Sequence, residues 1–258
     1  MELIFYKYQG TGNDFIILDN RQGNISLTQE QIKKMCNRRF GIGADGLMLL
    51  NEKKGYDFEM KYYNSDGNES SMCGNGGRCL VKFAYNMGIR RNVYHFTAID
   101  GDHEATIEEN NWVHLKMKDV IGIKRWLGDS ILDTGSPHYI KSASDIRNKN
   151  VFKDGKAIRY SEEFEKEGIN VNFVEELDNE IFVRTYERGV ENETLSCGTG
   201  VTAAALVFAH NDNGFNRVDV KTLGGKLAVE FDKVNEESFR NIWLCGPAEM
   251  VFRGSIEI

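Results

Sequence analysis

The sequence predicts an α/β protein of the α+β type, built from two pseudo-symmetric halves that each wrap a mixed, curved sheet around a central helix. Two observations predict this fold. The string Cys-Gly-x-Gly occurs twice, at 73–76 and 197–200, each time between a polar loop and an apolar run. Around both copies, segments that alternate like β-strands outnumber helical ones. The length of 258 residues suits two modest domains.

The first block runs from a strand to a helix. Residues 56–62 alternate between apolar and charged side chains, as in a half-buried strand. A polar loop leads to the turn Cys73-Gly74-Asn75-Gly76. Apolar residues at helical spacing follow in 78–88, where Gly88 is expected to end the helix.

The second block has the same order. Residues 180–187 alternate as a strand, and 188–196 form a polar loop before the turn at Cys197. A helix rich in Ala and Leu is predicted for 201–210, ended by the segment NDNG at 211–214.

Matched spacings predict that the chain arose by internal duplication. Asn64 precedes the first cysteine by nine residues, and Arg188 precedes the second by nine. Asn13 lies sixty residues before the first cysteine, and Ser136 lies sixty-one before the second. We therefore predict a repeated α/β unit.

The predicted halves are residues 1–117, which carry Cys73, and residues 118–246, which carry Cys197. The last strand, 247–258, is expected to return and complete the first half. It closes a series of four alternating segments that begins near residue 217.

One further helix is predicted for residues 28–41. Thr28 and Gln31 have the spacing of a capping box, and Gly41 is expected to end the helix. Its apolar face would consist of Ile32, Met35, Cys36 and Phe40.

Composition excludes several functions. The net charge of −7, without long runs of one sign, argues against nucleic-acid binding. No run of 18 apolar residues predicts a membrane span, and the N-terminus does not resemble a signal peptide. The five cysteines are odd in number and sparse, which favours free thiols in a reducing cytoplasm. Neither C-x-x-C nor a Cys–His spacing suggests a metal site.

The two cysteine turns predict acid–base chemistry on an anionic substrate. A helix N-terminus presents unpaired N–H groups that suit a carboxylate, and it lowers the pKa of a thiol there. Two such thiols facing each other should rest as one thiolate and one thiol, because two thiolates would repel. One thiol can then remove a proton from a carbon while the other delivers one to the opposite side. Inverting a stereocentre this way requires no cofactor.

The motifs also carry a family resemblance. GTGNDF, RRFGIGADG, YYNSDGNESSMCGNGGRC, GSPH, NVNFV and YERGVENETLSCGTG, in this order over nearly the whole chain, resemble diaminopimelate epimerase. The resemblance implies an active site in a cleft between two similar halves, and a homodimer. It implies a small-molecule amino-acid substrate, because this family interconverts LL- and meso-diaminopimelate for lysine and peptidoglycan-precursor synthesis.

The resemblance also implies roles for individual residues. Cys73 and Cys197 would be the acid–base pair. The remaining residues would bind substrate at three places. The backbone at Gly74, Asn75, Gly198 and Thr199 would hold the reacting carboxylate, Asn13 and Glu187 the reacting amine, and Asn64, Asn170 and Arg188 the far amino-acid end. Ser136 is expected to contact that end too, although the family usually has Asn there. Two further departures are Gln9, where His is frequent, and Gly46, where Gln is common.

Alternatives remain open at this point. A sister activity on the same fold, such as a proline-type racemase or a phenazine-pathway isomerase, would keep the cysteine chemistry. A non-catalytic redox module would instead use a Cys73–Cys197 disulfide. Three cysteines and one histidine are predicted to be structural: Cys36, Cys79, Cys245 and His138.

Overall fold

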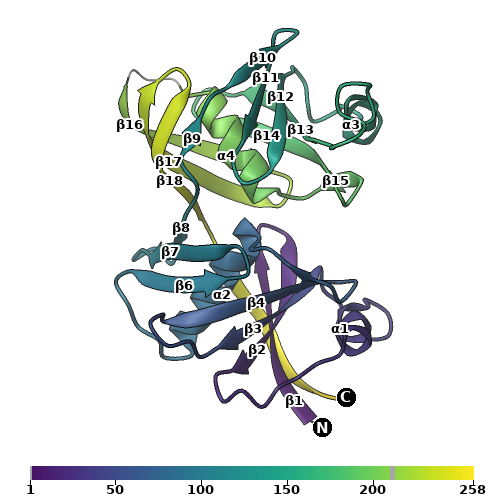
Figure 1. Ribbon diagram of the computed structural model, residues 1–258. Coiled ribbons are helices and arrows are strands. Elements are labelled where there is room, and N and C mark those ends of the chain that lie inside the picture. Colours follow the sequence, from purple (N-terminus) through teal and green to yellow (C-terminus); the bar gives the residue numbers. More distant parts are fainter. Residues whose placement is uncertain (1, 210–212) are drawn as a thin grey trace. The chain divides into compact units, whose positions relative to one another are not determined.

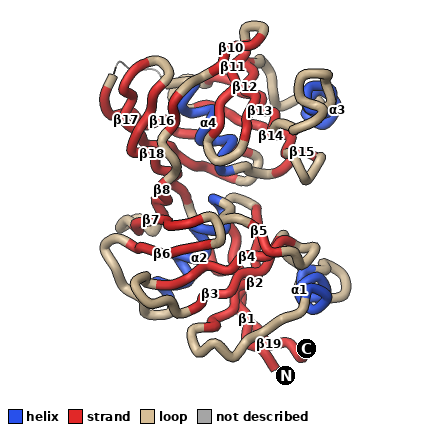
Figure 2. Tube along the Cα trace, viewed as in Figure 1, coloured by secondary structure: helices blue, strands red, loops and turns tan. Residues whose placement is uncertain are grey.

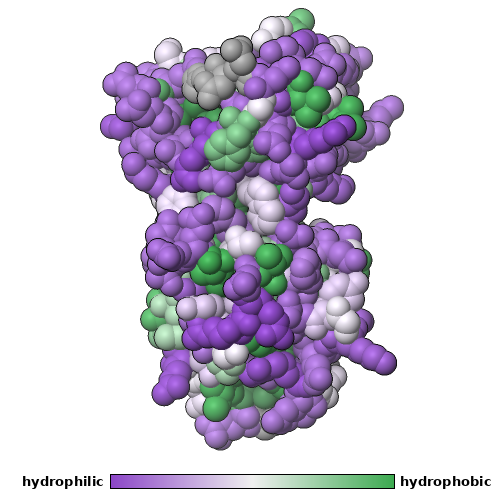
Figure 3. Space-filling model, turned by 90° about the vertical axis from the view of Figure 1, so that its left-hand side faces the viewer, coloured by the Kyte–Doolittle hydropathy of each residue, from purple (hydrophilic) through white to green (hydrophobic). Residues whose placement is uncertain are grey.

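The computed structural model describes residues 2–209 and 213–258 (Figure 1). The chain divides into two compact units, unit 1 being Met1–Leu115 with Pro247–Ile258, and unit 2 being Lys116–Gly246. Among the described residues, no helix has both the length and the apolar character needed to cross a lipid bilayer. On the face drawn in Figure 3, hydrophilic residues dominate and apolar side chains form small, separate patches.

Unit 1 is a mixed sheet with two helices. Its elements in chain order are β1 (Glu2–Gly10), β2 (Asn13–Asn20), α1 (Gln29–Cys36), β3 (Gly46–Asn51), β4 (Phe58–Asn64), β5 (Glu69–Ser70), α2 (Gly74–Asn86), β6 (Tyr94–Ala98), β7 (Gly101–Ile107), β8 (Val113–Lys116) and β19 (Glu249–Glu257). The strands pair in the order β19-β1-β2-β3-β4-β6-β7-β8, and short β5 pairs with the end of β4.

Unit 2 contains β9 (Val120–Ile121), β10 (Lys124–Trp126), β11 (Asp129–Asp133), β12 (Pro137–Ser142), α3 (Val151–Arg159), β13 (Asn170–Glu176), β14 (Ile181–Glu187), β15 (Asn192–Thr194), α4 (Gly198–Val207), β16 (Gly214–Thr222), β17 (Gly225–Asn235) and β18 (Ser238–Gly246). Its strands pair in the order β10-β11-β12-β13-β14-β16-β17-β18. Short β15 pairs with the end of β14, as β5 does with β4.

The two pairing orders are the same, element for element. In unit 1 the parallel pairs are β2–β3 and β4–β6, and in unit 2 they are β12–β13 and β14–β16. A helix connects the strands of each parallel pair, because parallel neighbours need a crossover rather than a tight turn. The prediction of a duplicated α/β fold is confirmed.

The central helix of each unit is buried on nearly all sides. Residues 74–81 of α2 are buried without interruption, and so are residues 200–206 of α4. A helix with this pattern must be surrounded by its own sheet, since an amphipathic helix would leave one stripe in water. Figure 2 shows α4 among the strands of unit 2, while α3 lies outside them.

Two predictions about helix bounds are corrected. Each Cys-Gly-x-Gly stretch is the first turn of a helix, with cysteine as N-cap, rather than a turn before it. A glycine of the second stretch allows close packing, since a Cβ at Gly200 would lie 2.3 Å from Asn172 Oδ1. Helix α4 ends at Val207, before the stop predicted at 211–214. Residues 210–212 of that region lie outside the described residues.

The first helix is shorter than predicted. The capping box of Thr28 and Gln31 is present, but α1 ends at Cys36 instead of Gly41. The Asn37 side chain accepts the backbone N–H groups of Arg39 and Phe40 and so turns the chain out of the helix. Phe40 is therefore 80% exposed and does not share the buried face.

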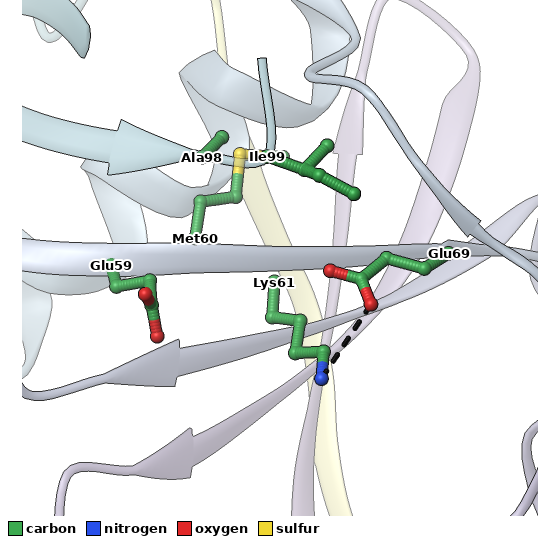
Figure 4. A pocket seen from close by; sticks show the side chains of 6 residues that line it. All are labelled: Glu59, Met60, Lys61, Glu69, Ala98 and Ile99. Carbon is green, nitrogen blue, oxygen red and sulfur yellow. Dashed lines mark ion pairs between the residues drawn. The ribbon is translucent and has the colours of Figure 1, made fainter. Parts of the chain in front are cut away.

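The predicted alternation along β4 is confirmed, although the strand begins at Phe58. Figure 4 shows Met60 pointing to one side of the strand, toward Ala98 and Ile99, and Glu59 and Lys61 pointing to the other. A small pocket of about 250 Å³ lies beside this strand, and none of the candidate site residues lines it. The four predicted C-terminal strands are confirmed as β16 to β19.

Candidate active site

In unit 1, a tight hairpin and a helix start bring candidate residues together. Thr11 and Gly12 connect β1 to β2 with φ angles of 52° and 84°, as a type I′ turn requires. The Arg78 guanidinium donates to the Thr11 hydroxyl at 3.3 Å and so ties this turn to α2. Asn13, the first residue of β2, consequently lies beside the N-terminus of α2.

The Asn13 side chain contacts the first predicted catalytic thiol. Cys73 is the N-cap of α2 and is partly buried. Its Sγ lies 3.6 Å from Asn13 Oδ1, and Asn75 Nδ2 donates to the same oxygen at 3.4 Å. The structure therefore gathers three predicted site residues around one amide oxygen, at the positive end of a helix.

An ion-pair network of Lys7, Asp14, Arg38 and Asp45 contacts this cluster through Asn13. Asp14 accepts from Arg38 at 2.9 and 2.6 Å and pairs with Lys7 at 2.6 Å. Burial opposes ionisation of Asp14, but its hydrogen bonds to these two cations outweigh burial and hold its pKa below the usual range. Arg38 also donates to Asp45, whose other oxygen accepts from Asn13 Nδ2 at 2.6 Å.

Asn64 lies next to the segment that carries Asp45, because the backbone N–H of Ser65 donates to the Asp45 carbonyl at 3.1 Å. It is exposed at the end of β4, opposite Gly46 of β3, and its backbone closes the loop to Asn68. A Cβ at Gly46 would lie 2.5 Å from the Tyr62 ring and 2.6 Å from the Tyr63 carbonyl oxygen. The Tyr62 ring thus occupies the space of a side chain at position 46, which explains why the residue there is glycine.

In unit 2, the second thiol also lies at the N-terminus of the central helix, with a different side-chain contact. Cys197 is the N-cap of α4 and is 7% exposed. Its Sγ lies 3.5 Å from the Thr199 hydroxyl, in a contact where either group can donate. The Thr134 hydroxyl donates to the Thr199 carbonyl at 2.8 Å and fixes the β11–β12 connection against α4. Gly198 and Thr199 form the first turn of that helix.

Three predicted residues for the far end of the substrate form one cluster. Asn170 Nδ2 donates to the Ser136 hydroxyl at 2.8 Å, and Asn170 Oδ1 accepts the Arg188 backbone N–H at 2.9 Å. The Arg188 guanidinium donates to Ser136 at 3.3 Å and to the Glu167 carbonyl at 3.1 Å. Serine at 136 therefore takes part in the cluster directly, despite its departure from the family pattern.

Glu187 ends β14 beside this cluster. Its Oε2 accepts from the Thr194 hydroxyl of β15 at 2.8 Å, which fixes the carboxylate by a short cross-strand bond. The Glu187 carboxylate is partly buried, and it can accept a hydrogen bond from an ammonium group.

His138 is structural, as predicted. Its side chain is fully buried, and its Nδ1 lies 3.1 Å from Asn172 Nδ2, so Nδ1 accepts and the ring is neutral. Asn172 Oδ1 in turn accepts from the Thr185 hydroxyl. Burial, followed by the charge of Arg188, lowers the pKa of His138 to about 3. A ring that stays neutral at physiological pH cannot stabilise the structure as a cation.

The low pKa of His138 gives a pH dependence of stability. Its unfolded pKa is near 6.5, so below this pH the unfolded chain binds a proton that the folded protein does not bind until about pH 3. The free energy of unfolding therefore falls as pH drops through this window and is unaffected above it. In His138→Gln this contribution disappears, so between pH 7.5 and 4.5 the variant should lose about 2 to 3 kcal/mol less than the wild type. Urea denaturation at both pH values measures this, and parallel losses would contradict it.

The other three cysteines are buried, as predicted: Cys36, Cys79 and Cys245. Burial raises the pKa of Cys36 and Cys79 to about 12, so both stay protonated and unreactive near neutral pH. The remaining departure, Gln9, accepts the Gly12 N–H at 2.9 Å and donates to Glu249 at 3.0 Å. It joins the β1–β2 turn to β19.

Sequence reasoning missed Asp45 and Arg78, which hold the amides beside Cys73. Both belong to the quoted motifs, within GIGADG and CGNGGRC, but no role was predicted for either. Arg78 is in fact fully buried and donates to Asn75 Oδ1 at 3.1 Å. The signal in the sequence was the presence of a charged residue inside an otherwise apolar or glycine-rich motif, which indicates a buried charge with a structural partner.

With this geometry in place, comparison with known proteins assigns the family. The family model described as diaminopimelate epimerase matches residues 5–121 and 130–251. The chain belongs to the diaminopimelate epimerase family. A diaminopimelate epimerase of Flavobacterium psychrophilum is 50% identical to it over 97% of this chain and 99% of the relative. One of Chlorobaculum tepidum is 43% identical over 96% and 99%.

Solved structures share the fold at low sequence identity. A phenazine biosynthesis protein of the PhzF family from Bacillus anthracis matches with a TM-score of 0.77 and 14% identity, covering 100% of both chains. A probable proline racemase from Agrobacterium radiobacter matches with a TM-score of 0.68 and 13% identity, covering 99% of this chain and 93% of the other. These similarities establish the diaminopimelate epimerase-like fold alone. The family itself is shown by the sequence matches.

Proposed function

We propose that this protein is a cofactor-independent isomerase that interconverts LL-diaminopimelate and meso-diaminopimelate in lysine and peptidoglycan-precursor synthesis. Membership of the diaminopimelate epimerase family over nearly the whole chain is the observation that carries the proposal. Cysteines at the N-caps of equivalent helices, Cys73 and Cys197, support it, because two acid–base groups are what inversion at one carbon needs.

In the proposed mechanism, one thiolate removes the α-proton and the other thiol donates a proton to the opposite face of the same carbon. The electron pair left by the broken C–H bond moves toward the adjacent carboxylate. Backbone N–H groups in the first turns of α2 and α4, at Gly74, Asn75, Gly198 and Thr199, would stabilise the charge that develops there. Turnover leaves the first sulfur protonated and the second ionised.

The remaining polar residues would hold the two amino-acid ends of the substrate. Asn13 and Glu187 would bind the reacting ammonium, since each presents an oxygen acceptor. Asn64, Ser136 and Asn170 would bind the far end, with Arg188 pairing its carboxylate through a planar fork of donors.

Incubation with LL-diaminopimelate in D2O tests the activity. We expect the meso isomer to form with deuterium at the inverted α-carbon, because the donated proton comes from a solvent-exchanged thiol. Absence of deuterium from both isomers would exclude the two-base reaction. Turnover of proline with none of diaminopimelate would identify the sister racemase activity, and no turnover with or without reductant would favour a redox module.

We also propose a cytoplasmic homodimer. The sparse, odd-numbered set of five cysteines suits a reducing compartment. In unit 1, the neighbouring strands β1 and β19 expose apolar side chains that a partner could cover: Ile4 (64%), Met250 (50%), Val251 (57%) and Phe252 (46%). Sedimentation equilibrium should show a dimer that Val251→Glu dissociates; a wild-type monomer would contradict the proposal.

A further inference from the structure

The loop that follows β14 carries Arg188 and is closed by Glu191. The Glu191 backbone N–H donates to the Glu187 carbonyl at 2.8 Å, and the Glu191 carboxylate accepts the Gly189 backbone N–H at 3.1 Å. Glu191 also has a positive φ of 55°, a conformation that a residue with a side chain keeps only where its surroundings hold it. The backbone on both sides of Arg188 is therefore tied to one residue.

The same carboxylate pairs with a second guanidinium, that of Arg159 at the end of α3. Arg159 Nε lies 3.5 Å from Glu191 Oε1, and the Tyr186 hydroxyl donates to Glu191 Oε2 at 3.2 Å. Burial opposes ionisation of Glu191, but the hydrogen bonds that it accepts and the charge of Arg159 outweigh burial and hold its pKa below the usual range. Glu191 therefore faces Arg159 as a charged carboxylate.

Arg159 in turn holds the segment that receives the Arg188 guanidinium. Its Nη1 donates to the carbonyls of residues 164–165, at 3.3 Å in each case. Further along this segment, the Glu167 carbonyl accepts from Arg188 at 3.1 Å. A Cβ at Gly168 would lie 2.7 Å from Arg159 Cζ and 2.8 Å from Arg188 Cδ, so both arginine side chains pack against this one glycine.

We propose that Glu191 is a positioning residue that holds Arg188 in place for the far carboxylate of the substrate, by its backbone through Gly189 and by its guanidinium through Arg159. The role of Arg188 in substrate binding rests on the proposed function. Glu191 also balances the charge of Arg159. Without it, a second guanidinium beside Arg188 would lack its carboxylate partner and would compete for the substrate carboxylate.

Two measurements on the substrate-free, full-length protein test the positioning itself. Hydrogen exchange followed by NMR reports on the Gly189 amide, and labelling with phenylglyoxal, read by mass spectrometry, reports on the Arg188 guanidinium. In Glu191→Ala we expect the amide to exchange about 10-fold faster and Arg188 to react about 3-fold faster, because each has lost a contact that restrains it. An unchanged rate of Arg188 labelling would overturn the proposal.

Glu175→Ala is the matched control. The Glu175 carboxylate also accepts backbone N–H groups in unit 2, those of Asp145 at 2.7 Å and Ile146 at 3.4 Å, and neither is a candidate site residue. Both rates should stay within a factor of about 2 of the wild-type values in this variant. Equal changes in the two alanine variants would indicate a general loosening of unit 2 and would overturn the proposal.

Glu191→Gln separates the two contacts of the carboxylate. Its amide oxygen can still accept the Gly189 N–H, but the charge opposite Arg159 is lost. The Arg188 labelling rate should therefore lie between those of the wild type and Glu191→Ala. This variant also decides the question if Glu191→Ala does not fold, because a wild-type labelling rate in Glu191→Gln would overturn the proposal.

Steady-state kinetics with LL-diaminopimelate tests the consequence for binding. Glu191→Ala should raise KM about 10-fold and leave kcat within a factor of about 2, because contacts to the far end are nearly the same in the ground and transition states. In an Arg188→Gln background, the same substitution should change KM by less than about 2-fold, since Glu191 acts through Arg188. A merely structural role would lower kcat equally in both backgrounds, and that result would overturn the proposal.

The two kinds of measurement separate this proposal from the proposed function. If the wild type does not act on diaminopimelate, the proposed function is rejected, while the exchange and labelling rates still decide whether Glu191 positions Arg188. Turnover by the wild type with unchanged Arg188 labelling in Glu191→Ala would keep the function and reject the positioning role.

Discussion

Replacing either Cys73 or Cys197 by alanine should lower the rate of diaminopimelate epimerisation by about 10³-fold or more. General acid–base groups typically contribute about 10² to 10⁴-fold, and in the proposed reaction neither thiol can replace the other, because each serves one face of the carbon. The double variant should be no slower than either single variant, since the two groups act as a unit. Initial rates of meso isomer formation, with deuterium incorporation in D2O, measure the loss.

Cys36→Ala is the control for this pair of variants. Cys36 is a free, buried cysteine in the core of unit 1, with its thiol held protonated by burial. Its truncation removes a sulfur without removing a reactive one, so epimerisation should stay within a factor of about 2 of the wild-type rate. A Cys73→Ala or Cys197→Ala variant as active as Cys36→Ala would contradict the two-base mechanism.

Replacing Arg188 by glutamine should lower kcat/KM for diaminopimelate by about 100-fold. The substitution removes a charge-assisted, forked interaction with the far carboxylate, worth about 3 kcal/mol. Because that end is remote from the reacting carbon, its binding is nearly the same in the ground and transition states, and the loss should appear mainly in KM. Arg188→Lys keeps the charge but not the fork, so its kcat/KM should lie between those of the wild type and Arg188→Gln. Steady-state kinetics with LL-diaminopimelate separates these effects.

The matched control is Arg217→Gln, also in unit 2. Arg217 pairs with Asp219 and Glu230, and neither partner is a candidate site residue. Its loss should leave KM unchanged. If Arg188→Gln changed kcat alone, or neither parameter, Arg188 would not bind the far carboxylate.

The site was partly predictable because its motifs are local. Each cysteine, its first-turn glycines and the polar loop before it are contiguous, so short stretches of sequence contain them. The cluster of Ser136, Asn170 and Arg188 required more, because it draws on three segments of unit 2. Matched spacing in the two halves marked Ser136 and Arg188, but the resemblance to a family assigned the cluster.

Errors arose where a local pattern had two physical explanations. Glycine after cysteine was interpreted as a turn, yet Gly200 is helical and is glycine because Asn172 fills the space beside it. Phe40 matched the helical period of Ile32 and Met35, yet Asn37 ends the helix before the period reaches it. The period of apolar residues does not show where a cap ends a helix or which side chain packs against a glycine, and these two contacts decided both positions.

The sequence by itself determined the duplicated α/β order, the strands with their buried faces, and the place of each cysteine close to the start of a buried helix, because alternation and spacing act over a few residues. Only the tertiary structure decided how Asn13 is oriented. Parallel pairing of β2 with β3 brings Asp45 to Asn13 across thirty-two residues, and the buried Arg78 reaches Asn75 from within α2. Hydrogen-bond direction depends on which charges surround an amide in space, and that arrangement exists only after the strands have paired.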